Sequence, residues 1–366
     1  MQQQPEGPVH RVAVIPGDGI GTEVVPAAQR VLERAGELYG FSWRWTELDW
    51  SCERYTRTGA MMPDDGLAQL AEHDQIFLGA VGYPGVPDHV SLWGLLIPIR
   101  RAFEQYVNLR PIRLLRGISS PLRTLPADGL DFVVVRENSE GEYSEIGGRL
   151  HRGTPREAAI QETVFTRVGV ERVVRYAMDL AGRRHGRLTS ATKSNGIIHT
   201  MPFWDEIVVE LTAGSGLEVS QVHIDALAAM FVLDPGRFDV VVASNLFGDI
   251  LTDLGAAIIG SIGIAPSANL NPERDFPSMF EPVHGSAPDI AGQGRANPVG
   301  QIWSGVMMLE HLGHREAAAA VLSAVEDALV DGAGRTPDLG GAASTDSATD
   351  AVLEALEASA RAGSTP

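Results

Sequence analysis

The sequence predicts an α/β fold, and three observations carry this prediction. Short runs of β-branched and other apolar residues have the composition of buried strands, as in residues 10–15 (HRVAVI) and 239–243 (DVVVA). Each run is followed by apolar residues at helical spacing, in residues 24–32 and 250–258. The composition, with 44% hydrophobic and 21% charged residues over 366 positions, is that of a globular protein with one large or two ordinary domains.

The charge and the cysteine content argue against several classes of protein. The formal net charge is −18 and the isoelectric point is near 4.9, so neither nucleic acid nor an anionic membrane is an expected partner. Cys52 is the only cysteine, which excludes an internal disulfide and a thiolate zinc site and fits a reducing compartment. We expect a cytoplasmic protein, because no apolar stretch spans a membrane and the start MQQQPEG lacks the order of a signal peptide.

The N-terminal strand, residues 10–15, ends at the glycine-rich turn 16–21 (PGDGIG). A strand, such a turn and a helix can begin a dinucleotide-binding domain, and Glu47 and Asp49 close the next expected strand, 41–48, where acidic ribose ligands would stand. The glycines occupy alternate positions, however, and do not match the G-x-G-x-x-G spacing. The alternative is a tight turn that needs glycine for its backbone angles.

The remaining elements follow from the same two periodicities. Further strands are expected at residues 75–80, 130–135, 160–165 and 217–222, and helices at 164–181, 227–231, 302–312, 315–329 and 352–356. Loops are expected at residues 81–92, 262–274, 280–298 and 332–347. The polar segment from about residue 144 to 165 has no core face of its own, so we interpret it as an arm or hairpin that pairs with another subunit.

Three arginines and a tyrosine are candidates for binding an anion. The segment 91–113 has amphipathic helical spacing, and because an interior proline costs roughly 3 kcal/mol, its helix should begin near Ile97, with the proline at position 98 in the first turn. Arg100 and Arg110 in this segment are either partners of a carboxylate or ordinary surface arginines. Arg136 and Tyr143 follow the end of the strand at 130–135.

Acidic and basic residues at other strand ends are candidates for a metal or catalytic site. Asp249 and Asp253 lie one turn apart on one face of the helix after the strand at 239–243, either as half of a divalent-metal site or as a solvated acidic face. Asp225 is a third acidic candidate, with a helix N-cap as the alternative. Lys193 follows a short strand, where a lysine is more often solvated than catalytic.

Seven motifs, in order, resemble those of the β-decarboxylating dehydrogenase family, which includes isopropylmalate, isocitrate, homoisocitrate and tartrate/D-malate dehydrogenases. They are IPGDGIGTEV, a double-arginine segment ending in YVNLRP, RENSEGEY, TKSNG, HIDALAAMFV, NLFGDILTDLG and FEPVHGSAPDI, and they extend from residue 11 to about residue 300. Segments such as SLWG and IAPSANLNPER look most like the branch of tartrate dehydrogenase/decarboxylase and D-malate dehydrogenase.

The resemblance implies a two-domain, isopropylmalate-dehydrogenase-like α/β fold that is not a standard Rossmann fold. Residues 1–105 and 261–366 would form a large cofactor-binding domain. Residues 106–260 would form a small domain for substrate binding and dimerisation, with the arm at about 144–165. The resemblance also implies a homodimer whose arms interlock and whose active sites are shared between subunits.

The roles of the catalytic and substrate-binding residues are implied by the same resemblance. Arginines 100, 110 and 136 would clamp the carboxylates of a small 2-hydroxy dicarboxylate, and the aspartates 249 and 253, with Asp225 of the other subunit, would bind Mg²⁺ or Mn²⁺. Lys193, also from the other subunit, would take the hydroxyl proton, and Tyr143 would protonate the enol after CO₂ departs. The resemblance also allows a monovalent cation such as K⁺ as a further cofactor.

The cofactor would bind along the loop that begins at Glu281. The residues that the resemblance assigns to it are Glu281, His284, Gly285, Ser286, Ala287, Asp289, Asn297 and, near the nicotinamide, Asn195. A carboxylate at position 289 accepts hydrogen bonds from ribose hydroxyls but repels a 2′-phosphate, which favours NAD over NADP.

Substrate choice depends on the residues before Arg100. Trp93 occupies the place of a glutamate in isopropylmalate enzymes, and its bulk would fill the space for an isopropyl group, which favours D-malate, converted to pyruvate and CO₂, or tartrate. Leu96 could still accept an alkyl group, so 3-isopropylmalate dehydrogenase of leucine biosynthesis is the alternative. A non-catalytic regulatory homologue is a remote alternative, because the metal aspartates, Lys193 and Tyr143 are all present.

Overall fold

The computed structural model describes residues 7–126 and 129–363. The chain divides into two compact units. The first unit comprises Met1–Gln105, Leu114–Pro121 and Ile259–Pro366, and the second comprises Tyr106–Arg113 and Leu122–Ile258. Within the described ranges, no helix combines the length and the hydropathy that crossing a bilayer requires.

The first unit is built on strands in the order β2-β1-β3-β12-β11. Their bounds are β1 (Val9–Gly17), β2 (Ser42–Glu47), β3 (Gln75–Ala80), β11 (Pro266–Leu270) and β12 (Ser278–Pro282). β1 runs parallel to β2 and β3, and β3 runs parallel to β12, whereas β11 is antiparallel to β12. The loops that follow β1, β2, β3 and β12 therefore leave the same edge of the sheet, which is where α/β proteins bind ligands.

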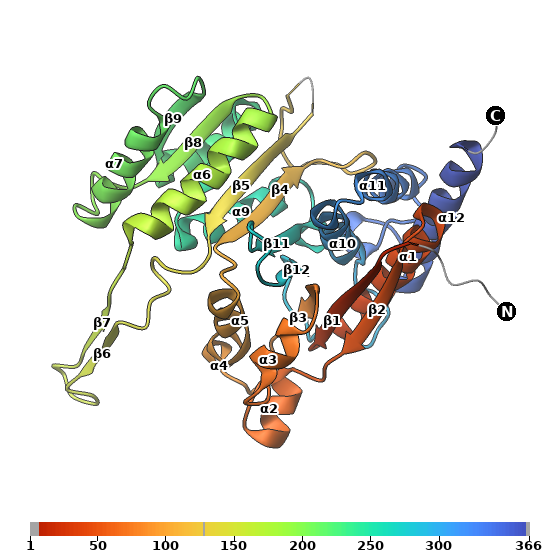
Figure 1. Ribbon diagram of the computed structural model, residues 1–366, viewed down its shortest axis with the longest axis horizontal. Coiled ribbons are helices and arrows are strands. Elements are labelled where there is room, and N and C mark those ends of the chain that lie inside the picture. Colours follow the sequence, from red (N-terminus) through yellow and green to blue (C-terminus); the bar gives the residue numbers. More distant parts are fainter. Residues whose placement is uncertain (1–6, 127–128, 364–366) are drawn as a thin grey trace. The chain divides into compact units, whose positions relative to one another are not determined.

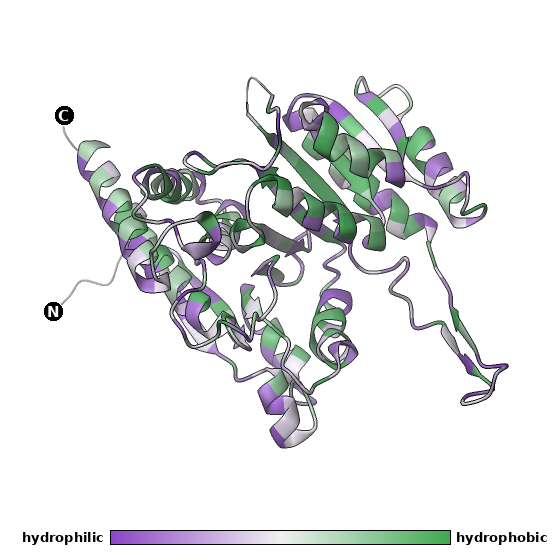
Figure 2. Ribbon diagram, turned by 180° about the vertical axis from the view of Figure 1, so that it is seen from behind, coloured by the Kyte–Doolittle hydropathy of each residue, from purple (hydrophilic) through white to green (hydrophobic). Residues whose placement is uncertain are grey.

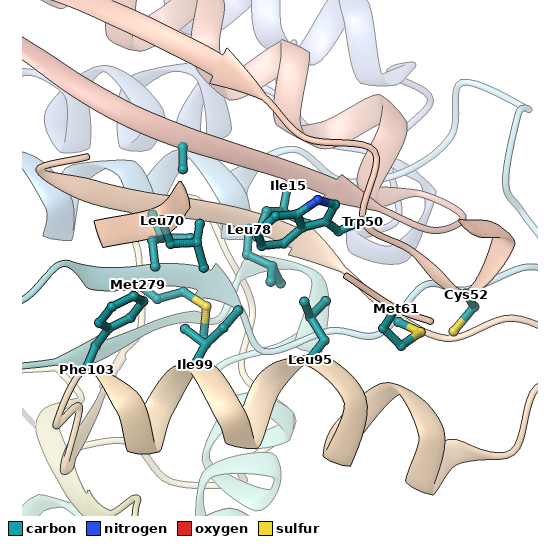
Figure 3. Close-up of a cluster of buried hydrophobic side chains, with 12 residues drawn as sticks. Ile15, Trp50, Cys52, Met61, Leu70, Leu78, Leu95, Ile99, Phe103 and Met279 are labelled. Carbon is teal, nitrogen blue, oxygen red and sulfur yellow. The ribbon is translucent and has the colours of Figure 1, made fainter. Parts of the chain in front are cut away.

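Helices cover this sheet and supply much of its core (Figure 1). They are α1 (Gly21–Tyr39), α2 (Cys52–Thr58), α3 (Gly66–Ala71), α4 (Asp88–Ser91), α5 (Ile97–Ala102), α10 (Val299–Leu312), α11 (Arg315–Val330) and α12 (Thr345–Gly363), with short 3₁₀ turns at Ile262–Ile264 and Pro337–Leu339. Figure 3 shows Leu95, Ile99 and Phe103 pointing from one helical run toward Leu78 and Met279 of the sheet.

A π-helical turn, Leu92–Leu96, joins α4 to α5. α5 begins at Ile97 with the proline in its first turn, as we expected, but residues 88–92 are helical, so a loop over all of 81–92 was wrong. Proline 98 has no N–H to donate, and in a regular α-helix its ring would crowd the carbonyl one turn back. In this structure the amide of Ile97 donates to Leu92 O, five residues back, which gives the wider π-helical turn. Trp93 lies in this turn, and the guanidinium of Arg101 lies 5.2 Å from the centre of its ring.

The second unit has strands in the order β4-β5-β10-β8-β9. They are β4 (Val107–Arg113), β5 (Asp131–Glu137), β8 (Arg187–Thr192), β9 (Glu218–His223) and β10 (Val240–Ala243), and all neighbouring pairs are parallel except β4 and β5. Helices α6 (Arg167–Arg183), α7 (Thr200–Thr212), α8 (Ile224–Leu233) and α9 (Asn245–Ile258) and a 3₁₀ turn at Pro235–Arg237 complete it. Figure 2 shows hydrophobic stretches among the strands and helices of this unit, and all four residues of β10 are buried.

The expected arm is a hairpin of β6 (Gly147–Leu150) and β7 (Ala158–Gln161), which projects from the second unit in Figure 1. All residues of both strands are exposed, including Leu150 and Ile160. An isolated two-stranded ribbon is marginally stable in water, so these side chains are available for packing against a partner.

The α/β prediction is confirmed, but three strands were missed. β4 falls in a segment expected to be helical, and β11 and the end of β12 fall in segments expected to be loops. These strands carry buried polar side chains, such as Asn108 in β4 and Asn269 in β11, which interrupt the apolar pattern. The amide of Asn269 donates a hydrogen bond of 2.7 Å to Glu281 of β12, so pairing across the sheet compensates for the burial.

Candidate active site

Helix α9 holds the two candidate metal ligands of the second unit. Its start is set by Glu142, whose carboxylate accepts hydrogen bonds from the Ser244 hydroxyl (2.7 Å) and the Leu246 amide (3.0 Å). An anion at this position also complements the positive end of the helix dipole. Asp249 and Asp253 follow one turn apart, on a helix that enters directly from the buried strand β10.

Arg136 is fixed by the first turns of the same helix. Its guanidinium donates to the main-chain oxygen of Asn245 (2.8 Å), to the Asn245 side-chain oxygen (2.6 Å) and to Asp249 Oδ1 (2.6 Å). A Cβ at Gly248 would lie 2.5 Å from Arg136 Cγ, so only glycine leaves room for the arginine. The sequence signal was available, since all of these partners belong to the motif NLFGDILTDLG.

Arg110 reaches the same carboxylates from β4. Its Nη1 lies 2.5 Å from the Thr252 hydroxyl, 3.4 Å from Asp249 Oδ1 and 4.0 Å from Asp253 Oδ1. The Tyr143 hydroxyl donates to Asp249 Oδ2 at 3.2 Å. We call Arg110, Arg136, Tyr143, Asp249 and Asp253 the reaction cluster.

The charges of the reaction cluster balance one another in part. Partial burial raises the pKa of Asp253, Arg110 and Arg136 lower it, and the neighbouring Asp249 carboxylate raises it further. The arginine side chains are only 10% and 2% exposed, whereas that of Asp253 is 61% exposed. Two buried cations therefore face a pair of carboxylates that remain open to solvent.

Lys193 and Asp225 form a separate pair in the second unit. Lys193 Nζ lies 2.7 Å from Asp225 Oδ1, and this hydrogen bond is the main cause that lowers the pKa of Asp225. Asp225 sits in the first turn of α8, whose N-cap is His223, so the N-cap alternative for Asp225 was wrong. Asn195 follows in an exposed turn. Among the described residues, no three acidic, histidine or cysteine side chains meet as a metal site, and Asp225 therefore does not join Asp249 and Asp253 within one chain.

In the first unit, Arg100 is bound to the strand that begins the expected cofactor loop. Its Nη2 donates to Glu281 Oε1 at 2.9 Å, and the pair is buried. Asn269 donates to the same oxygen at 2.7 Å. Leu96, one turn before Arg100, is partly buried against the core cluster of Figure 3.

A pocket of about 370 Å³ opens beside the loop after β12, and we call it the Ile20 pocket. Its apolar wall consists of Ile20, Ile262, Ala287, Ile290 and Pro337, and its polar groups come from Ser261, His284, Arg295, Asn297 and Asp338. Gly285 and Ser286 lie in the same loop, and Asp289 is exposed and outside the lining. The structure thus brings His284, Ala287 and Asn297 of the predicted set together.

His284 presents an unsatisfied acceptor in this pocket. Its Nδ1 lies 3.0 Å from Gly285 O, and because a carbonyl only accepts, Nδ1 carries the proton. Burial lowers the pKa of His284, so the ring is neutral and Nε2 keeps its lone pair. Nε2 is buried and has no partner among the residues described.

The glycine turn after β1 organises the loops around this pocket. The buried carboxylate of Asp18 accepts hydrogen bonds from the amides of Cys52 (2.9 Å), Glu53 (3.2 Å) and Gly82 (3.1 Å), which follow β2 and β3. The amide of Ile20 donates to Ser286 O at 2.8 Å, which ties in the loop after β12. The tight-turn interpretation of the motif thus describes its geometry.

Several of these residues were missed by sequence reasoning. Asn245, Thr252 and Glu142 hold the reaction cluster, and Asp18 and Asp338 hold the pocket. All but Asp338 lie inside the seven motifs. Asp338 lies in a stretch that resembled a linker, where only the Thr-Pro-Asp turn residues gave a signal.

Comparison with known proteins agrees with this geometry. Residues 11–355 match the isocitrate/isopropylmalate dehydrogenase family. The chain is 57% identical to a probable tartrate dehydrogenase/decarboxylase of Bacillus subtilis (strain 168), over 94% of this chain and 97% of that protein. It is 55% identical to the D-malate dehydrogenase [decarboxylating] of Escherichia coli (strain K12), over 94% and 98%. The crystal structure of isocitrate dehydrogenase from Methylococcus capsulatus superposes with a TM-score of 0.84 and 34% identity, covering 95% of this chain and 99% of that one.

Proposed function

Because the chain belongs to the isocitrate/isopropylmalate dehydrogenase family, as a decarboxylating 2-hydroxy-acid dehydrogenase, we propose that it oxidises and decarboxylates D-malate to pyruvate and CO₂ with NAD and a divalent metal, and that it also acts on tartrate. The observation that carries the proposal is the reaction cluster, in which two buried arginines and a tyrosine surround paired carboxylates. Relatives named for these two substrates, at 52 to 57% identity, support the choice of substrate.

Substrate binding would fall to the arginines. Arg110 and Arg136 present guanidinium groups that are already oriented by Thr252 and Asn245, and such forks match carboxylates well. Arg100 would complete the clamp. A C4 diacid offers two carboxylates to these cations without requiring a pocket for an alkyl group.

The carboxylates of Asp249 and Asp253 fit a divalent metal. They are hard oxygen ligands, one turn apart and partly exposed, which suits Mg²⁺ or Mn²⁺. When bound, the ion would act as a Lewis acid that withdraws electrons from the substrate's oxygen. We propose that Asp225 of a second subunit completes the site, because within one chain it pairs with Lys193 instead.

Proton transfer would depend on Lys193 and Tyr143. Lys193 Nζ is held by Asp225, and as a neutral amine it would accept the hydroxyl proton of the substrate. The Tyr143 hydroxyl, held by Asp249, would donate the proton that replaces CO₂.

The Ile20 pocket fits the adenosine half of NAD, which supplies the hydride acceptor of the reaction when bound. An apolar slot suits a flat base, and the orphaned Nε2 of His284 offers an acceptor to a base or ribose donor. Asp289, at the exposed end of the loop, would accept hydrogen bonds from ribose hydroxyls. We further propose a homodimer in which the β6–β7 arms pair.

The nearest alternative is 3-isopropylmalate oxidation, because the contact of the Trp93 ring with the Arg101 guanidinium, at 5.2 Å, competes with its proposed role of filling the space for an isopropyl group. The experiment is NADH production by the purified protein with Mg²⁺ or Mn²⁺, comparing kcat/KM for D-malate, L- and meso-tartrate and 3-isopropylmalate, with and without a chelator. The proposal expects D-malate or tartrate to lead and chelation to abolish turnover. A lead for 3-isopropylmalate would overturn the substrate, and turnover in excess chelator would overturn the mechanism.

A further inference from the structure

The Ile20 pocket contains three ionisable side chains, and only one of them lacks a partner. Burial keeps His284 neutral. The carboxylate of Asp338 accepts hydrogen bonds from Thr336 and Ser261 and from the amide of Asn297 (3.0 Å). Among the described residues, Arg295 forms no hydrogen bond or ion pair. The pocket therefore exposes one uncompensated positive charge, on a chain whose net charge is −18.

The backbone that carries Arg295 is held in place on both sides. The carboxylate of Glu23 accepts hydrogen bonds from the amides of Gly292 (2.6 Å) and Gly294 (2.9 Å). Thr345 donates from its amide to Gly294 O (2.8 Å) and from its hydroxyl to Ala296 O (2.7 Å). The side chain of Arg295 is exposed, so a free guanidinium stands on a fixed loop at the pocket.

A cation on a fixed frame is suited to binding an anion. Orienting the backbone in advance lowers the entropy that a ligand must overcome, and an arginine fork matches phosphate oxygens. The other pocket groups, an apolar wall and a neutral imidazole, suit a base rather than a charge. A ligand that combines a base with a phosphate would satisfy both parts.

We propose that Arg295 is a phosphate-binding residue of this pocket, and that it takes a phosphate group of the dinucleotide cofactor. This inference rests on the proposed function for the identity of that cofactor. NAD carries phosphate only in its diphosphate bridge, which is therefore the expected ligand of Arg295. A 2′-phosphate on the adenosine ribose, as in NADP, is the other source of the same chemistry, and the test separates the two. Asp289, which disfavours a 2′-phosphate, lies outside the pocket lining, whereas Arg295 belongs to it.

The test is binding of three probes to the full-length protein by calorimetry: adenosine, ADP and adenosine 2′,5′-bisphosphate. We compare the wild type with R295Q, which removes the charge, and with R295K, which keeps the charge without the planar fork. R295Q should bind adenosine normally and lose about tenfold or more in affinity for ADP, for the bisphosphate or for both, because a charge-assisted hydrogen bond is lost. R295K should recover part of that loss.

A matched control removes an equal charge elsewhere in the first unit. Arg44 is exposed on β2, and R44Q should leave all three affinities unchanged. A loss for ADP, with or without a loss for the bisphosphate, identifies the diphosphate, because the bisphosphate also carries a phosphate at the 5′ position. A loss for the bisphosphate alone identifies the 2′-phosphate. An equal loss for adenosine, no loss in R295Q, or no probe bound by the wild type would overturn the inference. Phosphate-dependent binding without D-malate oxidation would overturn the proposed function instead.

Discussion

The reaction cluster of the second unit and the Ile20 pocket of the first unit differ in what holds their side chains. In the reaction cluster, the groups proposed to bind ligand are one another's partners: Arg136 binds Asp249, and Tyr143 donates to the same carboxylate. In the Ile20 pocket, the shape is set by residues that we assign no ligand contact, such as Asp18 and Glu23, through backbone amides.

This difference predicts different consequences of substitution. Removing one side chain from the reaction cluster changes the charge and the orientation of its neighbours, so the chemical step should suffer most. Removing a residue that frames the pocket leaves every proposed contact in place but loosens it, so affinity for the cofactor should suffer most. The ratio of effects on kcat and on KM therefore tests the comparison.

The largest effect is expected for D249N. The amide keeps the shape of the side chain but removes a metal ligand and the shared partner of Arg136 and Tyr143, so kcat/KM for D-malate should fall by about a thousandfold or more. Steady-state kinetics and Mn²⁺ titration would measure this loss. D179N, an exposed aspartate on α6, is the matched charge control and should behave like the wild type. Mn²⁺ affinity that is equal in D249N and the wild type would contradict the assignment.

A smaller loss is expected for T252V. The Thr252 hydroxyl lies 2.5 Å from Arg110, and a hydrogen bond to a charged group typically corresponds to a factor of about 10–100 in kcat/KM. T252S keeps the hydroxyl and should restore most of the activity. Equal activity of T252V and T252S would show that the hydroxyl does not position Arg110.

Substitution of a residue that sets the shape of the Ile20 pocket should change KM for NAD. In D18A the amides of Cys52, Glu53 and Gly82 lose their acceptor, so the loops after β2 and β3 should loosen and KM for NAD should rise about tenfold, with kcat changed by no more than about twofold. S51A is a matched control, because Ser51 caps α2 through the Arg54 amide without joining two loops. S51A should lower stability by about 1 kcal/mol and leave KM unchanged. A fall in kcat without a rise in KM in D18A would reverse the comparison.

The sequence predicted the reaction cluster better than the pocket, for a physical reason. The aspartates stand one turn apart on a helix and Arg136 near the end of a strand, so local periodicity already places Asp249 beside Asp253. Arg110 is the exception, because its strand β4 was expected to be helical. The Ile20 pocket is assembled from four distant segments around residues 20, 262, 287 and 337, and no local pattern brings these together. Strands such as β11 were missed for a related reason, because their buried polar residues pair with other elements, as Asn269 does with Glu281 of β12.

The smallest effect on activity is expected from substitution of His311, which should change stability alone. This residue packs against β12, the strand that begins the cofactor loop. Its Nε2 is 3.4 Å from the Ser278 hydroxyl of β12, and burial, followed by the nearby Arg274, lowers the pKa of the ring from 6.5 to about 4. Between these two values the unfolded chain binds a proton that the folded protein does not. The contribution of His311 to the free energy of unfolding is therefore complete above pH 6.5 and is lost, by up to about 3 kcal/mol, as the pH falls toward 4.

Urea unfolding of the wild type and of H311Q across this range would measure that contribution. The two curves should converge as the pH falls, while kcat and KM near pH 7 stay similar, because the ring contacts Ser278 and Phe280 of β12 and is not part of the pocket lining. His284, whose pKa burial also lowers, adds to the acid sensitivity of both proteins and cancels in the difference. Curves that remain parallel from pH 7 to pH 4 would show that His311 titrates alike in the folded and unfolded states. In that case a lowered imidazole pKa would not be a feature that distinguishes the surroundings of the Ile20 pocket from the charged reaction cluster.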